Sequence, residues 1–287
     1  FALLKDTDGK YYTYEEYQSL IKDNQTDKDG NLIYLYSNNM DEQYSYIDAA
    51  KNRGYNILLM DGQLDVAMIS MLEQKFEKSR FTRVDSDVKE EHKEANLESN
   101  QREILSSVFR SQLPQIKKVE FNVETQALGE NGAPIMITQS EYMRRMKEMA
   151  NIQAGMSFYG EMPNMYNLVL NADHKLVKQV LTDADNSCKA ALEPIESEMA
   201  NLNNRRKELQ KAQEGKKTED IPQAEKDELN DIEKKISDET TKKQAVLGEY
   251  ANGNKIIHQL IDLALLQNNM LKGEALTNFV KRSIELI

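Results

Sequence analysis

The sequence of 287 residues predicts a mixed α+β fold in two parts. Short apolar runs alternate with helical segments over residues 1–86, which is typical of a small three-layer α/β subdomain with a short parallel sheet. Residues 102–287 begin with a helix and strands and then become helical. We expect them to form an α+β C-terminal domain, joined to the first part by a polar linker over residues 87–101.

Turn and capping residues mark the elements of the first part. Thr13 and Glu16 have the spacing of a capping box, and Gly54 is a typical helix stop. The predicted helices are residues 13–22, 41–53 and 64–76, and the predicted strands are residues 32–36, 56–60 and 81–84. Asp6 to Gly9 and Asp27 to Gly30 faintly resemble calcium loops, but the first ligand position of an EF-hand fails in both, so we predict simple turns.

The second part opens with a helix that Pro114 ends. Alternation of apolar and polar residues predicts a half-buried strand, the Asn131-Gly132 pair marks a turn, and a returning strand follows. Ser140 is the expected cap of the next helix, and Asn171 the cap of a later one. The predicted strands are residues 118–125, 134–138 and 166–170.

Methionines cluster in residues 142–178. Several follow a three-residue step, which makes one slowly drifting stripe on a helix, with charged residues opposite. The stripe predicts either a helix that faces the core or an adaptable binding surface, because methionine is flexible and polarizable. The candidate residues of that surface, with those of a glycine-bounded loop, are Met143, Met146, Met149, Ile152, Met156, Phe158, Tyr159 and Met162.

Residues 186–246 are highly charged, with thinly spaced apolar residues on both sides of a polar break near residues 214–222. This pattern predicts an inserted antiparallel helical hairpin with a narrow seam. The hairpin is either a solvated spacer or a docking arm, and the second alternative would make the chain a coiled-coil scaffold or adaptor acting through residues 195–246.

Two terminal helices, residues 255–272 and 274–287, are separated by Gly273. The first is apolar nearly all round, so the pair has to bury more than one face. Two such helices from each of two chains would close a four-helix bundle, the alternative being burial within one chain. The candidate dimer-interface residues are Ile257, Leu260, Ile261, Ala264, Leu265, Leu276, Phe279, Val280 and Ile284.

The composition excludes several classes of function. A net charge of -11 argues against a nucleic-acid partner, and no apolar run is long enough for a membrane helix. Cys188 is the only cysteine, which fits a reducing cytoplasm and excludes an intrachain disulfide.

No catalytic or metal-binding pattern stands out. The histidines (His92, His174 and His258) lack acidic partners at metal-motif spacing, and no nucleophile–base set is recognisable. We therefore predict that this chain is not itself an enzyme and holds no cofactor or metal. A small α/β enzyme with a site near Asp61-Gly62 is the remaining alternative, although no glycine-rich phosphate loop follows.

An ordered series of motifs resembles the heat-shock protein 90 family of molecular chaperones, in its bacterial form. The series includes RGYNILLMDGQLD from Arg53, KKVEFNVETQAL from Lys117, APIMIT, MYNLVLNADHKLVKQVL from Met165 and IIHQLIDLALLQNN. Ala172 replaces the usual proline of the fourth motif. The resemblance covers nearly the whole chain except residues 186–246, which lie outside the common pattern.

The resemblance implies an ATP-dependent, homodimeric, cytoplasmic chaperone of the stress response. This chain, which begins at Phe1, would be a fragment: the end of the middle domain plus the dimerisation domain. ATP and Mg²⁺ would bind a domain upstream of it. The terminal helices would make the dimer contact, and the methionine helix with the loop after it would face a cleft and contact unfolded client proteins.

Overall fold

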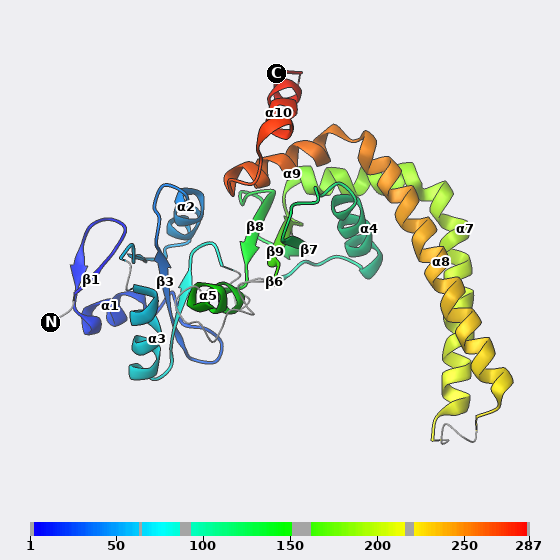
Figure 1. Cartoon of the computed structure of the whole chain (residues 1–287), viewed down its shortest axis with the longest axis horizontal. Coiled ribbons are helices and arrows are strands. Elements are labelled where there is room, and N and C mark those ends of the chain that lie inside the picture. The colour runs from blue at the N-terminus through cyan, green and yellow to red at the C-terminus, as the bar shows by residue number, and fades with distance from the viewer. Residues whose placement is uncertain (1–2, 63–64, 87–92, 151–161, 216–220, 286–287) are drawn as a thin grey trace. The chain divides into compact units, whose positions relative to one another are not determined.

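The computed structural model describes residues 3–62, 65–86, 93–150, 162–215 and 221–285 of the chain (Figure 1). Its contacts divide the chain into two compact units. The first comprises Phe1–Asn96, Pro114–Lys175 and Leu260–Ile287, and the second comprises Leu97–Leu113 and Leu176–Gln259. The mixed α+β class is confirmed, whereas the predicted domain boundaries stay a prediction.

A three-stranded parallel sheet organises the start of the first unit, as the alternating pattern predicts. The strand order is β4-β3-β5, with β3 in the centre. The strands are β3 (Leu32–Ser37), β4 (Ile57–Leu59) and β5 (Ser79–Arg83), and the helices are α1 (Tyr14–Ile21), α2 (Tyr44–Asn52) and α3 (Asp65–Lys75).

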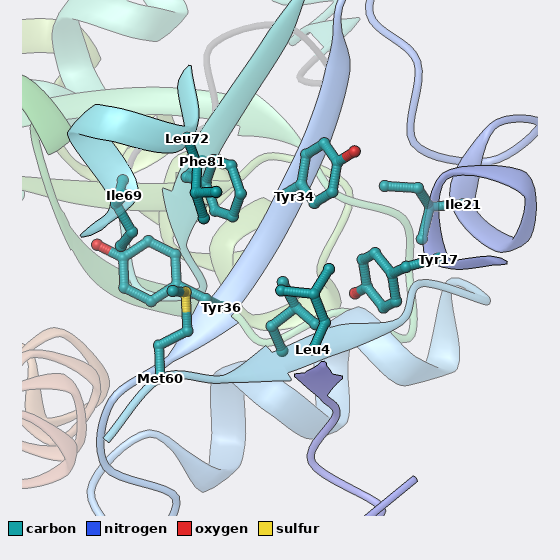
Figure 2. Packing of buried hydrophobic residues seen from close by; sticks show 10 residues of the cluster. Leu4, Tyr17, Ile21, Tyr34, Tyr36, Met60, Ile69, Leu72 and Phe81 are labelled. Atoms are coloured by element: carbon teal, nitrogen blue, oxygen red, sulfur yellow. The ribbon is translucent and has the colours of Figure 1, made fainter. Parts of the chain in front are cut away.

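Helices cover both faces of this sheet. Successive side chains of β3 point to opposite faces, and both sets are apolar, so each face needs a covering helix. Tyr34 and Tyr36 point to the face covered by α1 and α3, where Tyr34 stacks on Phe81 with 4.5 Å between ring centroids (Figure 2). Ile33 and Leu35 point to the other face, which packs on α2. A strand that is buried on both faces has a continuous apolar sequence, and the residues LIYLY of β3 form such a run.

The local signals predicted at Thr13, Glu16 and Gly54 are confirmed. The Thr13 hydroxyl accepts from the Glu16 amide, and the Glu16 carboxylate accepts from the Thr13 amide at 2.8 Å, which completes the capping box. Gly54 follows α2 at φ +81°. Asp6 accepts two backbone amides within its own loop, so this loop is a turn whose carboxylate is used locally. An antiparallel pair that sequence reasoning missed, β1 (Leu4–Lys5) with β2 (Tyr11–Tyr12), flanks it.

A four-stranded sheet with the order β6-β7-β9-β8 forms the rest of the first unit's β structure. Its strands are β6 (Lys93–Glu94), β7 (Val119–Ala127), β8 (Ile135–Gln139) and β9 (Asn164–Asn171). The strand β8 is antiparallel to β7, as predicted. It pairs with β9 and not with β7, because β9 lies between them. The expected hairpin is therefore wrong, and β6 adds a strand inside the segment expected to be a linker.

Asn171 does not cap a helix, contrary to the sequence prediction. It is fully buried at the end of β9, and its side-chain amide oxygen accepts from the Leu128 amide at 3.1 Å. Its amide nitrogen donates to the Gly129 carbonyl at 2.9 Å. Asn171 thus ties β9 to the turn between β7 and β8, and the following helix begins only at Lys175.

The second unit consists of long helices (Figure 1). They are α4 (Ser99–Arg110), α7 (Lys175–Gln213), α8 (Gln223–Gly253) and the start of α9 (Lys255–Gln267). Arg205 of α7 pairs with Glu228 of α8 at 2.7 Å, and Glu196 of α7 pairs with Lys243 of α8 at 3.0 Å. The earlier residue of α7 pairs with the later residue of α8, so the two helices are antiparallel.

The first terminal helix ends earlier than predicted. The helix α9 stops at Gln267, and Asn269 adopts the left-handed conformation at φ 56°. Gly273, at φ +60°, begins α10 (Gly273–Glu285) instead of ending α9. Arg282 of α10 forms an ion pair with Asp262 of α9, which joins the two helices.

Lys243 is buried where three helices of the second unit meet. Its exposed fraction is 4%, and its ammonium group reaches Glu103 of α4 at 2.9 Å and Glu196 of α7 at 3.0 Å. Burial opposes the charged form, but the two carboxylates outweigh it and raise the pKa of Lys243. Lys243 therefore stays charged and acts as the polar contact that holds α4, α7 and α8 together.

We predict that Lys243→Ala lowers the free energy of unfolding by about 3 kcal/mol, because it removes a buried stem and its ion pairs together. Urea unfolding followed by circular dichroism measures the change. The neighbouring Lys242→Ala is the matched control, since Lys242 is exposed and should have no measurable effect. Equal effects of the two substitutions would contradict a structural role for Lys243.

Candidate functional site

The methionine helix is α5 (Glu141–Ala150), and its buried side is the charged one. Glu141 and Arg144 are its buried residues, with exposed fractions of 7% and 4%. Met143, Met146 and Met149 are half-buried. Ion pairs occupy the buried side of α5, and these three methionines are neither buried nor exposed, so the core-facing and the binding-surface interpretations both stay predictions for them.

The Glu141 carboxylate is the centre of this buried network. It accepts hydrogen bonds from the Ser86 hydroxyl at 2.5 Å, the Arg83 backbone amide at 3.1 Å and the Tyr36 hydroxyl at 3.2 Å. It also pairs with Arg144 at 2.5 Å and with Arg145 at 2.6 Å. The first three groups belong to β3, to β5 and to the turn after β5, so the carboxylate fastens α5 to the parallel sheet.

The two arginines extend the network across the first unit. Arg145 pairs with Glu73 of α3 at 2.7 Å and donates to the Phe81 carbonyl. Arg144 pairs with Glu148 one turn further along α5, at 2.5 Å, and donates to the Tyr36 hydroxyl. Three elements of the α/β part, β3, β5 and α3, are thus joined to α5 by charge-assisted bonds.

The network also fixes the protonation states of its members. Burial by itself would raise the pKa of Glu141, but Arg144, the Ser86 hydroxyl and Arg145 together hold that pKa below its ordinary value. Burial is also the largest influence on Arg144, but Glu141, Tyr36 and Glu148 together outweigh it, so the pKa of Arg144 is raised. The groups therefore remain ionised at neutral pH.

Lys147 holds residues 162–164, which follow α5 in the chain, close to this helix. Its ammonium group donates to the Met162 carbonyl and to the Asn164 side chain, both at 2.6 Å. Met162, which is half-buried, is thereby held next to α5. The other predicted surface residues, Ile152, Met156, Phe158 and Tyr159, lie outside the described residues.

The predicted dimer residues divide into two groups. Those of α9 are already buried within the chain, with exposed fractions of 2% or less: Ile257, Leu260, Ile261, Ala264 and Leu265. No described residue of α10 is buried, and Val280 and Ile284 are 47% and 67% exposed. Leu276 and Phe279 are half-buried, and α9 adds the exposed Leu263 and Leu266, which sequence reasoning missed.

The described residues offer no grouping of three or more His, Cys, Asp or Glu side chains that could hold a metal ion. In the same part of the chain, no helix is long and apolar enough to cross a membrane. The predictions of no metal and no cofactor stay predictions.

The chain is similar to curated bacterial proteins over its whole length, α7 and α8 included. It is 70% identical to the chaperone protein HtpG of Bacteroides fragilis and 69% identical to that of Bacteroides thetaiotaomicron. It is 44% identical to the chaperone protein HtpG of Porphyromonas gingivalis. In each case the match covers 100% of this chain and 43% of the relative, so the chain spans less than half the length of these proteins. No family model matches the chain.

These relatives confirm the resemblance seen in the sequence motifs, and they place the chain among the heat-shock protein 90 chaperones. Within that class it belongs to the HtpG family of bacterial chaperone proteins.

We predict that Glu141→Gln lowers the free energy of unfolding by about 3 kcal/mol at neutral pH, because the buried Arg144 and the half-buried Arg145 lose a shared counterion. The pKa of Glu141 is lower in the folded than in the unfolded chain, so its stabilisation is present above about pH 4.3 and disappears as the pH falls through the folded pKa. The deficit of the variant relative to the unmodified chain should therefore shrink in acid.

Urea unfolding at a series of pH values measures this difference. Glu208→Gln is the control, because Glu208 pairs with Arg205 in an exposed position and should change little. A deficit that does not depend on pH would contradict the ionised, shared state of Glu141.

Proposed function

We propose that the chain is the C-terminal half of an ATP-dependent homodimeric chaperone, in which it provides self-association and part of the client-binding surface. The observation that carries the proposal is the 70% identity over the whole chain to proteins named chaperone protein HtpG. ATP and Mg²⁺ would bind the portion of the protein outside this chain. The whole protein would act in the cytoplasm, on unfolded or partly folded proteins.

The client surface that we propose is the outward side of α5. The charged side of this helix is held against the parallel sheet by Glu141 and Arg145. Met143, Met146 and Met149 follow a three-residue step along another side of the helix and are half-buried, and Lys147 keeps Met162 near α5. Flexible thioether side chains on a fixed helix can repack against apolar segments of many shapes, which suits a chaperone with varied clients.

The self-association surface that we propose is the apolar face of α10, with a second chain as its occupant. Leu276, Phe279, Val280 and Ile284 follow helical spacing, and none of them is buried within the chain. The exposed Leu263 and Leu266 of α9 lie on the helix to which Arg282 ties α10. Two copies related by a two-fold axis would cover these residues in a four-helix bundle, and the five buried residues of α9 would support it from inside.

A scaffold function acting through α7 and α8 has less support. The apolar residues of the predicted seam are buried or half-buried, as Leu209 and Ile232 illustrate with 5% each. Among the described residues of α7 and α8, no large apolar side chain is exposed. The pair therefore uses its apolar side chains internally, and its outer surface is charged.

We predict that Val280→Asp combined with Ile284→Asp weakens self-association about a hundredfold, since each apolar side chain contributes roughly 1.5 kcal/mol when buried. Sedimentation equilibrium measures the dissociation constant. Leu20→Asp is the control, because Leu20 is equally exposed, at 48%, on α1. A dimer of unchanged affinity would rule out α10 as the contact.

We predict that Met143→Ser combined with Met146→Ser weakens binding of a permanently unfolded, fluorescently labelled protein by about tenfold. The melting temperature should change little, because both side chains are only half-buried. Fluorescence anisotropy measures the binding. Met71→Ser, which changes an exposed methionine on α3, is the matched control. Loss of folding in the double variant would show that these methionines support the structure instead.

A further inference from the structure

The apolar packing on the two faces of the parallel sheet is unequal. Among the described residues, the buried cluster around Tyr34 and Tyr36 has ten members, whereas the cluster on the α2 side has four: Ile33, Leu35, Ile47 and Ile57. Helix α2 contributes the small residues Ala49 and Ala50 beside the second cluster, and an apolar cavity of about 80 Å³ remains next to them. This face of the sheet therefore has room for an aliphatic group.

Three polar side chains in the wall of this cavity are already bonded within the protein. Gln25 donates to a carbonyl of β3 at 2.8 Å and accepts from the backbone amide that precedes β4 at 2.7 Å. The Tyr46 hydroxyl donates to a carbonyl of β8, and the Ser86 hydroxyl donates to Glu141. The cavity therefore favours an aliphatic occupant. An apolar cavity of about 150 Å³ binds benzene, so one of about half that size accepts three or four carbon atoms.

A second cavity, of about 360 Å³, adjoins the first, because Tyr46, Ala49, Arg53 and Met136 line both. Asp48 and Arg53 are the charged residues in the described part of its wall. Arg53 is also the charged residue in the described wall of the apolar cavity. The guanidinium group therefore belongs to the junction of the two cavities, and the carboxylate belongs to the larger cavity alone.

These two charges are not neutralised by each other or by another described side chain. The guanidinium group of Arg53 makes no hydrogen bond or ion pair with a described residue. The Asp48 carboxylate accepts one hydrogen bond, from the Asn52 side chain to Oδ2 at 3.1 Å, which leaves Oδ1 without a described partner. Both charged side chains are exposed, so a ligand can reach them from solvent. A carboxylate and a guanidinium that do not pair can each bind one end of a ligand that carries both charges.

We propose that the two cavities form a binding site for a free α-amino acid with a branched aliphatic side chain, such as leucine or valine. The ligand carboxylate pairs with Arg53, the ligand ammonium group pairs with Asp48, and the side chain of three or four carbon atoms enters the apolar cavity. A simple carboxylate or a simple amine would use only one of the two charges. The site is separate from the proposed client surface on α5 and does not depend on self-association.

The test follows the isotope-labelled methyl signal of Met136 by NMR, because Met136 lines both cavities. Met60, which is buried in the cluster on the other face of the sheet, supplies the reference signal. L-leucine should shift the Met136 signal in a saturable manner, with a dissociation constant of about 1 mM. N-acetyl-leucine lacks the ammonium group and leucinamide lacks the carboxylate, so each should bind about tenfold more weakly. L-phenylalanine, whose side chain is too large, should not shift the signal.

Substitutions of the two charged residues assign each end of the ligand. Arg53→Gln should weaken L-leucine about tenfold but leave leucinamide unchanged, and Asp48→Asn should weaken L-leucine but leave N-acetyl-leucine unchanged. Lys51→Gln is the matched control, because it removes a charge from the same helix and lines neither cavity. Ala50→Leu fills the apolar cavity and should abolish binding. The exposed Arg53 and Asp48 keep the test decisive if Ala50→Leu fails to fold.

Three results would overturn the proposal. The first is the absence of any saturable shift of the Met136 signal with L-leucine. The second is equal binding of L-leucine and N-acetyl-leucinamide, which carries neither charge, because the site would then be an apolar cavity that does not recognise an amino acid. The third is an Arg53→Gln variant that weakens L-leucine and leucinamide equally, since Arg53 would then act in some way other than by pairing with the ligand carboxylate.

Discussion

The arrangement of the first unit depends on one buried carboxylate. Glu141 accepts hydrogen bonds from Tyr36, Arg83, Ser86, Arg144 and Arg145, which come from the parallel sheet and from its own helix. A carboxylate removed from water is costly unless its lone pairs are satisfied, so these donors have to meet at one point. That requirement fixes the rotation of α5 about its axis. Because the charges face inward, the half-buried methionines occupy another side of the helix.

Local sequence could not predict this orientation. The stripe of methionines and the opposite row of charges define two sides of α5, but the choice of the inner side depends on Glu73 and Tyr36, which are far away in the chain. Glu141, Arg144 and Arg145 do show spacings of three and four residues. The same spacings are typical of ion pairs on solvent-exposed helices, so the signal exists but does not distinguish the two environments.

Elements specified by neighbouring residues were predicted well. The apolar run of β3, the capping box of α1 and the left-handed Gly54 all follow from a few adjacent side chains. Sheet order is a long-range property, and there the prediction failed: β9 inserts between β7 and β8. Asn171 failed for a similar reason, because its amide bonds to a turn more than 40 residues away, which no local capping rule describes.

Tyr46 adds a constraint that joins the α/β part to the terminal helices of the same unit. Its hydroxyl lies 2.5 Å from the Ile137 carbonyl of β8 and 3.3 Å from the side-chain oxygen of Asn268, just after α9. Burial raises the pKa of Tyr46 to about 12, so the phenol keeps its hydrogen at neutral pH. A phenol has only one hydrogen to donate, and the distances show that β8 receives the stronger bond. A movement of the connection between α9 and α10 toward Tyr46 would therefore compete with the Ile137 carbonyl of β8 for that hydrogen.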